Sequence, residues 1–235
     1  NNYASLKNWF PHIHIDQKKL MDYRYQDCIN LMAVGIRFAD AVHTVSPSYK
    51  EDVLLPSAPP EFIGGESLEK DLQQANNEER LFGILNGCNY NNIRVANTGQ
   101  LYRNIVRALF RWLQDESKKY KSDFLAHTGE KVMRYVENRP KFIVSSVARL
   151  TEQKFYFFKR SAEAFVEVLD KLKKVDGIMM ILGTGDPDYE NLLRDMSYKY
   201  ENFIFTNGQS EDLIDSIYLE SDLYFMPSLF EPCGI

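Results

Sequence analysis

The sequence predicts an α/β protein built on parallel strands. In the second half of the chain, short apolar runs alternate with segments of helical spacing, and the runs cover residues 141–148, 177–182, 202–205 and 222–226. Strands that alternate with helices form βαβ units with right-handed crossovers. Glycine-bearing loops follow two of these runs, and loops at the carboxyl ends of parallel strands hold ligands.

The segments between these runs have the spacing and the capping residues of helices. Asp186 and Pro187 stand where an N-cap and a first helical residue are expected. Ser210 precedes Glu211 and Asp212, two acids that the helix dipole favours in a first turn. The apolar residues at helical spacing are Phe158, Ala162, Phe165, Val166, Leu169 and Leu172, followed by Tyr189, Leu192, Leu193 and Met196.

The first half of the chain is less regular. Helical periodicity predicts a helix over residues 18–39, and β-branched residues predict a short strand at 43–46. Residues 47–65 are rich in Pro, Ser and Gly and predict a loop. A strand is predicted at 81–85, before an Asn-Gly turn, and a helix from 101 to 112.

Composition and charge argue against several classes of protein. The formal net charge of −5 gives no electrostatic support for nucleic-acid binding. No stretch is long and apolar enough to predict a membrane span. Cys28, Cys88 and Cys233 lie far apart, a pattern typical of reduced thiols in a cytosol-like compartment. Because the chain begins at Asn1 rather than methionine, we expect the natural N-terminus, with any signal or transit peptide, to lie upstream.

A pair of cations follows the first apolar run of the second half. Arg149 stands at the carboxyl end of that predicted strand, and Lys154 follows in the loop that enters a helix. Arginine grips a phosphate with a bidentate fork, and lysine acts as a point charge, so the pair suits a diphosphate. The alternative is two solvated charges at the end of a strand.

Two further loops follow predicted strands. Gly183-Thr184-Gly185 would let the backbone approach a ligand, although a tight turn with a capping aspartate explains the same residues. Near the end of the chain, the carboxylate of Glu231 could accept hydrogen bonds from sugar hydroxyls, and Gly234 would open the next helix; a surface turn is the alternative.

A metal site is not expected. His12, His14 and Asp16 would share one face of an extended segment, which resembles a metal-ligand pattern, but no cysteine or second histidine cluster completes it. The sequence also contains no phosphate loop and no zinc-protease motif.

Six segments in order resemble the bacterial and plant glycogen/starch synthase family. They are Gly35-Ile-Arg-Phe-Ala-Asp40, Thr44-Val-Ser-Pro-Ser-Tyr49, Gly83-Ile-Leu-Asn-Gly87, Ala148-Arg-Leu-Thr-Glu-Gln-Lys154, Leu182-Gly-Thr-Gly-Asp-Pro187 and Ser228-Leu-Phe-Glu-Pro-Cys-Gly234. The resemblance implies a glycosyltransferase-B fold, with two Rossmann-like domains and the active site in the cleft between them. It implies transfer of glucose from ADP-glucose to the non-reducing end of an α-1,4-glucan, with retained configuration and no cofactor or metal.

The resemblance also implies roles for individual residues. Arg149 and Lys154 would bind the donor diphosphate, and Glu231 would hydrogen-bond the glucosyl hydroxyls. The other residues that it places around the donor are Asn86, Gly183, Thr184, Gly185, Gln209, Cys233 and Gly234.

Two departures from the family pattern keep alternatives open. Gln209 stands where the family often has an aromatic ring against adenine, and Phe155 follows Lys154 where the family usually has glycine. A related enzyme that uses a UDP- or GDP-sugar is therefore a second reading. A catalytically silent module that binds glucan or nucleotide sugar is a third.

Three ranges describe the expected domain organisation. Residues 1–90 would be the end of the first domain, 91–139 a helical crossover or linker, and 140–235 the first half of the nucleotide-sugar-binding domain. With half of each domain we expect the chain to be inactive alone. A cytoplasmic location is expected for a bacterial parent, and a plastid for a plant or algal one.

Overall fold

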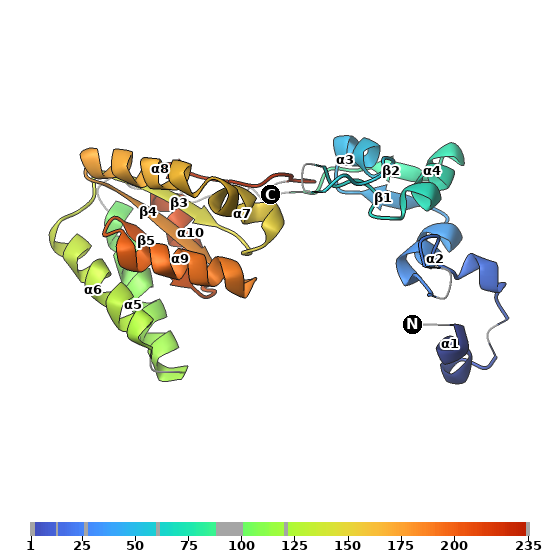
Figure 1. Ribbon diagram of the computed structural model, residues 1–235, viewed down its shortest axis with the longest axis horizontal. Helices are drawn as coiled ribbons and strands as arrows, with labels where there is room; N and C mark the ends of the chain where they lie inside the picture. The colour runs from blue at the N-terminus through green and yellow to red at the C-terminus, as the bar shows by residue number, and fades with distance from the viewer. Residues whose placement is uncertain are drawn as a thin grey trace. The chain divides into compact units, whose positions relative to one another are not determined.

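The computed structural model describes residues 3–12, 14–25, 28–59, 62–87, 101–119 and 122–233 (Figure 1). The chain divides into two compact units. Unit 1 comprises Asn1–Asn89 and Phe230–Ile235, and unit 2 comprises Tyr90–Leu229. Each unit is described by itself below.

Unit 1 is built on a parallel pair of short strands, β1 and β2, in which Val42 is paired with Leu81. Helices α2 and α4 pack beside the pair around Ile36, Leu72 and Ala75. The bounds are α1 (Tyr3–Trp9), a 3-10 helix η1 (Gln17–Lys19), α2 (Leu31–Phe38), β1 (Val42–Thr44), α3 (Pro47–Asp52), α4 (Glu69–Asn77) and β2 (Leu81–Gly83).

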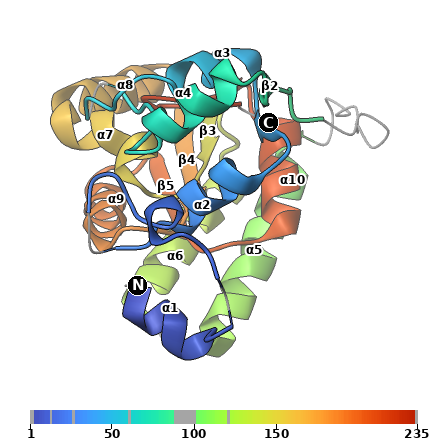
Figure 2. The same cartoon turned by 90° about the vertical axis from the view of Figure 1, so that its right-hand side faces the viewer.

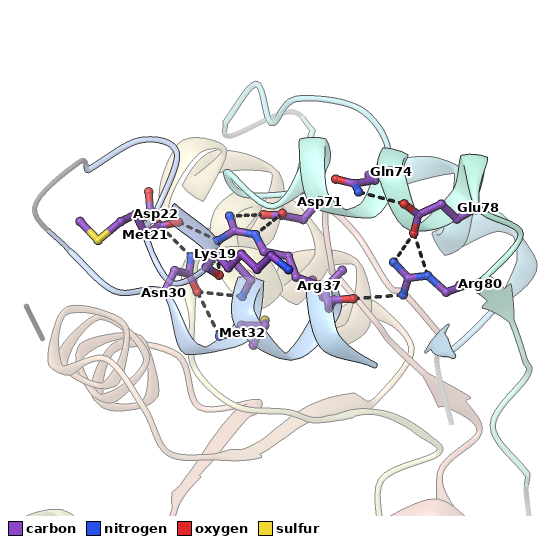
Figure 3. Close-up of polar contacts among 12 residues, drawn as sticks. Lys19, Met21, Asp22, Asn30, Met32, Arg37, Asp71, Gln74, Glu78 and Arg80 are labelled. Atoms are coloured by element: carbon purple, nitrogen blue, oxygen red, sulfur yellow. Dashed lines mark hydrogen bonds and ion pairs between the residues drawn. The ribbon is translucent and has the colours of Figure 1, made fainter. Parts of the chain in front are cut away.

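An arginine of α2 ties three segments of unit 1 together (Figure 3). The Arg37 guanidinium forms a bidentate ion pair with the buried Asp71 of α4, at 2.6 and 3.0 Å. Its Nη1 donates to the carbonyls of Lys19 and Met21, at 2.9 and 2.8 Å. A bidentate charged pair satisfies an otherwise costly buried carboxylate, so this contact fixes α2 against α4.

The predicted helix over residues 18–39 is wrong for its first half. The carboxylate of Asp22 accepts the backbone N–H groups of Arg24 and Tyr25 and the side-chain amide of Asn30. Asn30 in turn caps α2 by accepting from the N–H groups of Met32 and Ala33. Short polar side chains that bond the local backbone compete with helix formation, so α2 starts only at Leu31.

The predicted loop at residues 47–65 also begins with a helix. The side chain of Ser46 caps α3, and Pro47 occupies its first turn. Proline is tolerated there because the first N–H groups of a helix have no intrahelical partner. The Pro-rich composition therefore indicated a helix start as well as a loop.

Unit 2 is a parallel α/β sheet in the strand order β5-β4-β3-β6 (Figures 1 and 2). The chain moves outward from β3 to β5 and then returns to pair β6 on the other side of β3. This reversal makes the boundary between β3 and β6 a topological switch point, where open α/β sheets bind ligands. The strands are β3 (Phe142–Val147), β4 (Gly177–Gly183), β5 (Phe203–Asn207) and β6 (Leu223–Tyr224).

Both faces of this sheet are covered by helices (Figure 1). Alternate residues of β4 point to opposite faces: Met180 and Leu182 join one core, and Met179 and Ile181 join the other. The first core is completed by α5 (Leu101–Lys119), α6 (Asp123–Glu137) and α10 (Glu211–Glu220). The second is completed by α7 (Glu152–Arg160), α8 (Ala162–Lys174) and α9 (Pro187–Lys199).

The compact units divide the chain differently from the ranges expected from sequence. The expected linker, residues 91–139, contains α5 and α6, whose apolar residues Ile105, Trp112 and Val132 are buried in the first core of unit 2. An apolar stripe of this kind has to be covered, and the sheet of unit 2 covers it. The last residues, 230–235, group with unit 1.

A buried lysine of α6 donates hydrogen bonds to carbonyls at the end of α9. Lys131 on α6 is 1% exposed, and its ammonium donates to the carbonyls of Ser197, Tyr200 and Phe203, with 2.8 and 2.9 Å to the last two. Ser197 and Tyr200 lie at the end of α9, and Phe203 begins β5. The last carbonyls of a helix have no intrahelical donor and carry its negative dipole end, so a buried cation suits the first two. Burial lowers the pKa of Lys131 to about 8.

Replacing this lysine should destabilise unit 2. Lys131→Met keeps the length of the side chain but removes a donor from each of three carbonyls, so we expect the free energy of unfolding to fall by about 2 kcal/mol. Urea unfolding followed by circular dichroism measures this. Lys171→Met, which breaks only an exposed pair with Glu167, should change it by less than about 0.5 kcal/mol, and equal losses would contradict the capping role.

The deficit of Lys131→Met should also depend on pH. The pKa of Lys131 is about 8 in the folded state against 10.5 for a free lysine, so between these values the unfolded chain binds more protons. Wild-type stability therefore gains from Lys131 as pH rises through this window, and the gain disappears as pH falls through 8. Unfolding at about pH 7.5 and about pH 9.5 should show a larger gap at the higher pH; a constant gap would mean that the buried amine keeps its proton.

Candidate functional site

A pocket of about 440 Å³ lies at the carboxyl edge of the unit 2 sheet. The ends of β3 and β4 and the loop between β5 and α10 form its walls. Four of the residues singled out from sequence line it together: Arg149, Gly183, Thr184 and Gln209. The other lining residues, which sequence reasoning did not assign to a site, are Val147, Ala148, Leu182, Gly208, Ser210, Glu211 and Ile214.

The two glycines after β4 are required by the neighbouring backbone. A Cβ on Gly183 would lie 2.1 Å from the carbonyl oxygen of Ala148, and one on Gly185 would lie 2.3 Å from that of Leu150. This close approach extends the pairing of β3 and β4, because the N–H of Leu150 donates to the carbonyl of Thr184 at 2.9 Å. The sequence suggested that these glycines let the backbone approach a ligand. In the structure, the lack of a Cβ at both positions leaves room for the backbone of residues 148–150, the segment that carries Arg149.

Gly185 does not line the pocket. Its N–H donates to the carboxylate of Glu190 at 2.9 Å, and the same carboxylate accepts from the side chain of Asn207. Asp186 then caps α9 as predicted, by accepting from the N–H of Asp188 at 2.9 Å, with Pro187 in the first turn.

Arg149 and Lys154 occupy consecutive turns after β3. Arg149 is exposed at the pocket. The N–H of Thr151 donates to its carbonyl and the N–H of Lys154 donates to that of Thr151, both at 3.0 Å. Lys154 is half-buried in the first turn of α7 and is not one of the pocket-lining residues.

Phe155 explains why the family's usual glycine can be replaced here. Its ring is fully buried, and it packs against Phe158 and Tyr189 with centroid distances of 5.0 and 6.3 Å. An aromatic side chain at this position adds apolar contact to the core rather than blocking the loop.

The wall opposite β3 depends on a close contact with α5. Gly208 lines the pocket and packs against the buried indole of Trp112, where a Cβ would lie 2.5 Å from Nε1. Gln209 follows with an exposed side chain, and Ser210 caps α10 by accepting from the N–H of Leu213. The pocket therefore combines a backbone-lined wall with one exposed amide.

The remaining predicted donor residues belong to unit 1 and are described there. Asn86 is exposed, three residues beyond the end of β2. The Ser46 hydroxyl donates to the carbonyl of Pro232 at 2.7 Å, which anchors the loop that carries Glu231 and Cys233. Their roles beside a donor stay predictions, and Gly234 lies outside the described residues.

The described residues offer no ready-made metal site. Within them, no group of three or more His, Cys, Asp or Glu side chains is placed to hold an ion. His12, His14 and Asp16 are exposed. Among the helices of the same residues, none combines the length and apolarity that a membrane crossing needs.

Comparison with known proteins identifies the family. Residues 2–74 match the family model described as starch synthase catalytic domain, and residues 130–235 match glycosyl transferases group 1. The chain is a relative of the glycogen and starch synthases. The glycogen synthase of Lachnospira eligens is 32% identical over 226 residues, which cover 96% of this chain and 42% of that protein. The Clostridium novyi glycogen synthase is 32% identical over 217 residues, 91% of this chain and 40% of the relative.

A solved structure supports the fold of this synthase relative. The catalytic domain of starch synthase IV from Arabidopsis thaliana, bound to ADP and acarbose, matches with a TM-score of 0.62 and 22% identity. The match covers 94% of this chain and 42% of that chain. The predicted α/β fold of the glycosyltransferase-B type is confirmed, in a chain that spans less than half the length of these relatives.

The contact between Gly208 and Trp112 yields a stability test. Gly208→Ala should force the pocket wall or the indole to move, with a loss of about 1–3 kcal/mol. Gly129→Ala is the matched control, because its Cβ would meet only Leu113 at an ordinary 3.7 Å within α6. Circular dichroism in urea should show the first variant destabilised and the second unchanged or more stable. An equal free energy of unfolding for the two variants would show that the pocket wall or the indole moves at no measurable cost in stability.

Proposed function

We propose that the protein to which this chain belongs is a glycogen or starch synthase that transfers glucose from ADP-glucose to the non-reducing end of an α-1,4-glucan, with retention. The observation that carries the proposal is the pocket at the carboxyl edge, where Arg149, Gly183, Thr184 and Gln209 converge. The glycogen synthases among its relatives, and the ADP bound to the plant synthase of the same fold, support it.

In this proposal the cations act on the leaving group. The nucleoside diphosphate gains negative charge as the bond to glucose breaks, and cations that are already in position stabilise that charge more than the ground state. Arg149 would grip the diphosphate through its fork, and Lys154 would add a point charge from the first turn of α7. The positive charge then comes from these side chains, and no metal ion is needed.

The sugar and the base would be read by different parts of the chain. Glu231 would accept hydrogen bonds from glucosyl hydroxyls, with Cys233, Gly234 and Asn86 beside the donor. Gln209 would meet the base: its amide both donates and accepts, so it can hydrogen-bond a base that the family often contacts with an aromatic ring. The same amide makes a UDP- or GDP-sugar the second candidate donor.

Glucose transfer to glycogen by the full-length protein tests the proposal. We expect transfer from ADP-glucose, and Lys154→Ala should lower kcat by about 100-fold because a donor to the developing charge is lost. Lys159→Ala is the matched control on the same helix, since Lys159 forms an exposed pair with Asp188 and lies over the ring of Tyr189, away from the pocket-lining residues; its rate should be unchanged. Activity should also survive a metal chelator.

Other outcomes of this assay favour the alternatives. Transfer from UDP-glucose or GDP-glucose alone would overturn the choice of donor and point to Gln209. Glycogen binding without transfer from any donor would favour a silent binding module. Equal loss in Lys154→Ala and Lys159→Ala would contradict the diphosphate role of Lys154.

A further inference from the structure

The edge of β3 that faces β6 obtains its hydrogen bonds from three different sources. At Ile143, the N–H donates to the carboxylate of Asp222 at 2.7 Å and the carbonyl accepts the N–H of the same residue at 2.9 Å. At Ser145, β6 pairs as a strand, and the N–H of Phe225 donates to the carbonyl of Ser145 at 2.6 Å. Val147 is the next residue on this edge, since alternate residues of a strand face the same neighbour.

In the register of β3 and β6, β6 has no backbone N–H for the carbonyl of Val147. Alternate residues of β6 donate to β3, so after Phe225, which donates to Ser145, the donor to Val147 would be residue 227. That residue is Pro227, which has no N–H. The described β6 accordingly ends at Tyr224, although the sequence predicted a strand to residue 226. The chain then turns toward α7, where the N–H of Leu229 donates to the carbonyl of Gln153 at 2.9 Å.

The side chain of Tyr224 replaces the missing strand partner. Its hydroxyl donates to the carbonyl of Val147 at 2.8 Å and accepts the N–H of the same residue at 3.3 Å. The ring of Tyr218 on α10 packs beside it, with the two ring centroids 5.1 Å apart. A phenol has one proton and two lone pairs, so the hydroxyl of Tyr224 can donate to Val147 and accept from it at the same time.

The two hydrogen bonds between Tyr224 and Val147, which we call the clamp, lie beside the candidate site. Val147 lines the pocket and ends β3, and Arg149 follows two residues later. The other edge of this segment is held by the pairing with Leu182 and Thr184. Tyr224 therefore completes the hydrogen bonding of β3 on the side of the switch point, where the strand would otherwise end without a partner.

We propose that Tyr224 is a positioning residue, whose hydroxyl fixes the end of β3 and thereby the place of Arg149 against the donor diphosphate. The proposal rests on the proposed function for the identity of the ligand, but the clamp itself does not. It gives Tyr224, which does not line the pocket, a defined effect on phosphate binding.

The test compares Tyr224→Phe with Tyr218→Phe in the full-length protein. Tyr224→Phe removes both bonds to Val147 and keeps the ring, whereas Tyr218→Phe removes only the hydroxyl of the neighbouring ring. For Tyr224→Phe we expect the ADP Kd to rise about fivefold with little change for AMP, because both hydrogen bonds to the end of the strand are lost near the cation. Amide exchange at Val147 should accelerate about tenfold. Tyr218→Phe should stay within about twofold on both measures.

A double-mutant cycle separates positioning from general loosening. If Tyr224 acts through Arg149, Tyr224→Phe should have little further effect on ADP binding in an Arg149→Ala background. Additive losses, or equal losses for ADP and AMP, would overturn the positioning role. Unchanged exchange at Val147 would overturn the clamp. A wild-type protein that binds no ADP would overturn the proposed function and the positioning role. Amide exchange at Val147 in Tyr224→Phe would then still test whether the hydroxyl of Tyr224 holds the end of β3.

Discussion

The unit that holds the candidate pocket depends on how closely the ends of β3 and β4 approach each other. Parallel strands usually diverge into their loops, but here the pairing continues past both strands to a bridge between Leu150 and Gly185. The contact is possible because neither Gly183 nor Gly185 has a Cβ. It brings the segment with Arg149 directly against the loop with Thr184, so the shape of the pocket follows from backbone sterics more than from side-chain polarity.

Local sequence signals predicted the elements of unit 2 well. The strands were visible as apolar runs, and the caps of α9 and α10 were visible in Asp186, Pro187 and Ser210. In unit 1 the same reasoning failed where a polar side chain competes with the helix, as Asp22 does. Lys131 had no local signal, because its three acceptors are more than sixty residues away in the sequence and only the folded chain brings them together.

The candidate site was predictable to the extent that topology alone gathers residues. Loops that follow neighbouring parallel strands meet at one edge, and so Arg149, Thr184 and Gln209 share a pocket. The roles of two residues could not be predicted from the sequence. The role of Gly208 depends on where Trp112 packs in the folded chain. The role of Tyr224 depends on the strand order, because β6 lies beside β3 and has no N–H at Pro227, so the carbonyl of Val147 is left for a side chain to satisfy.

The packing of Trp112 against Gly208 gives the pocket an intrinsic optical reporter. The indole is buried, its Nε1 has no hydrogen-bond partner among the described residues, and the glycine that it contacts borders the pocket. Indole emission responds to the polarity and charge of its surroundings. A ligand that shifts the backbone at Gly208 will therefore alter the fluorescence of Trp112, and occupancy can be followed in solution without any attached dye.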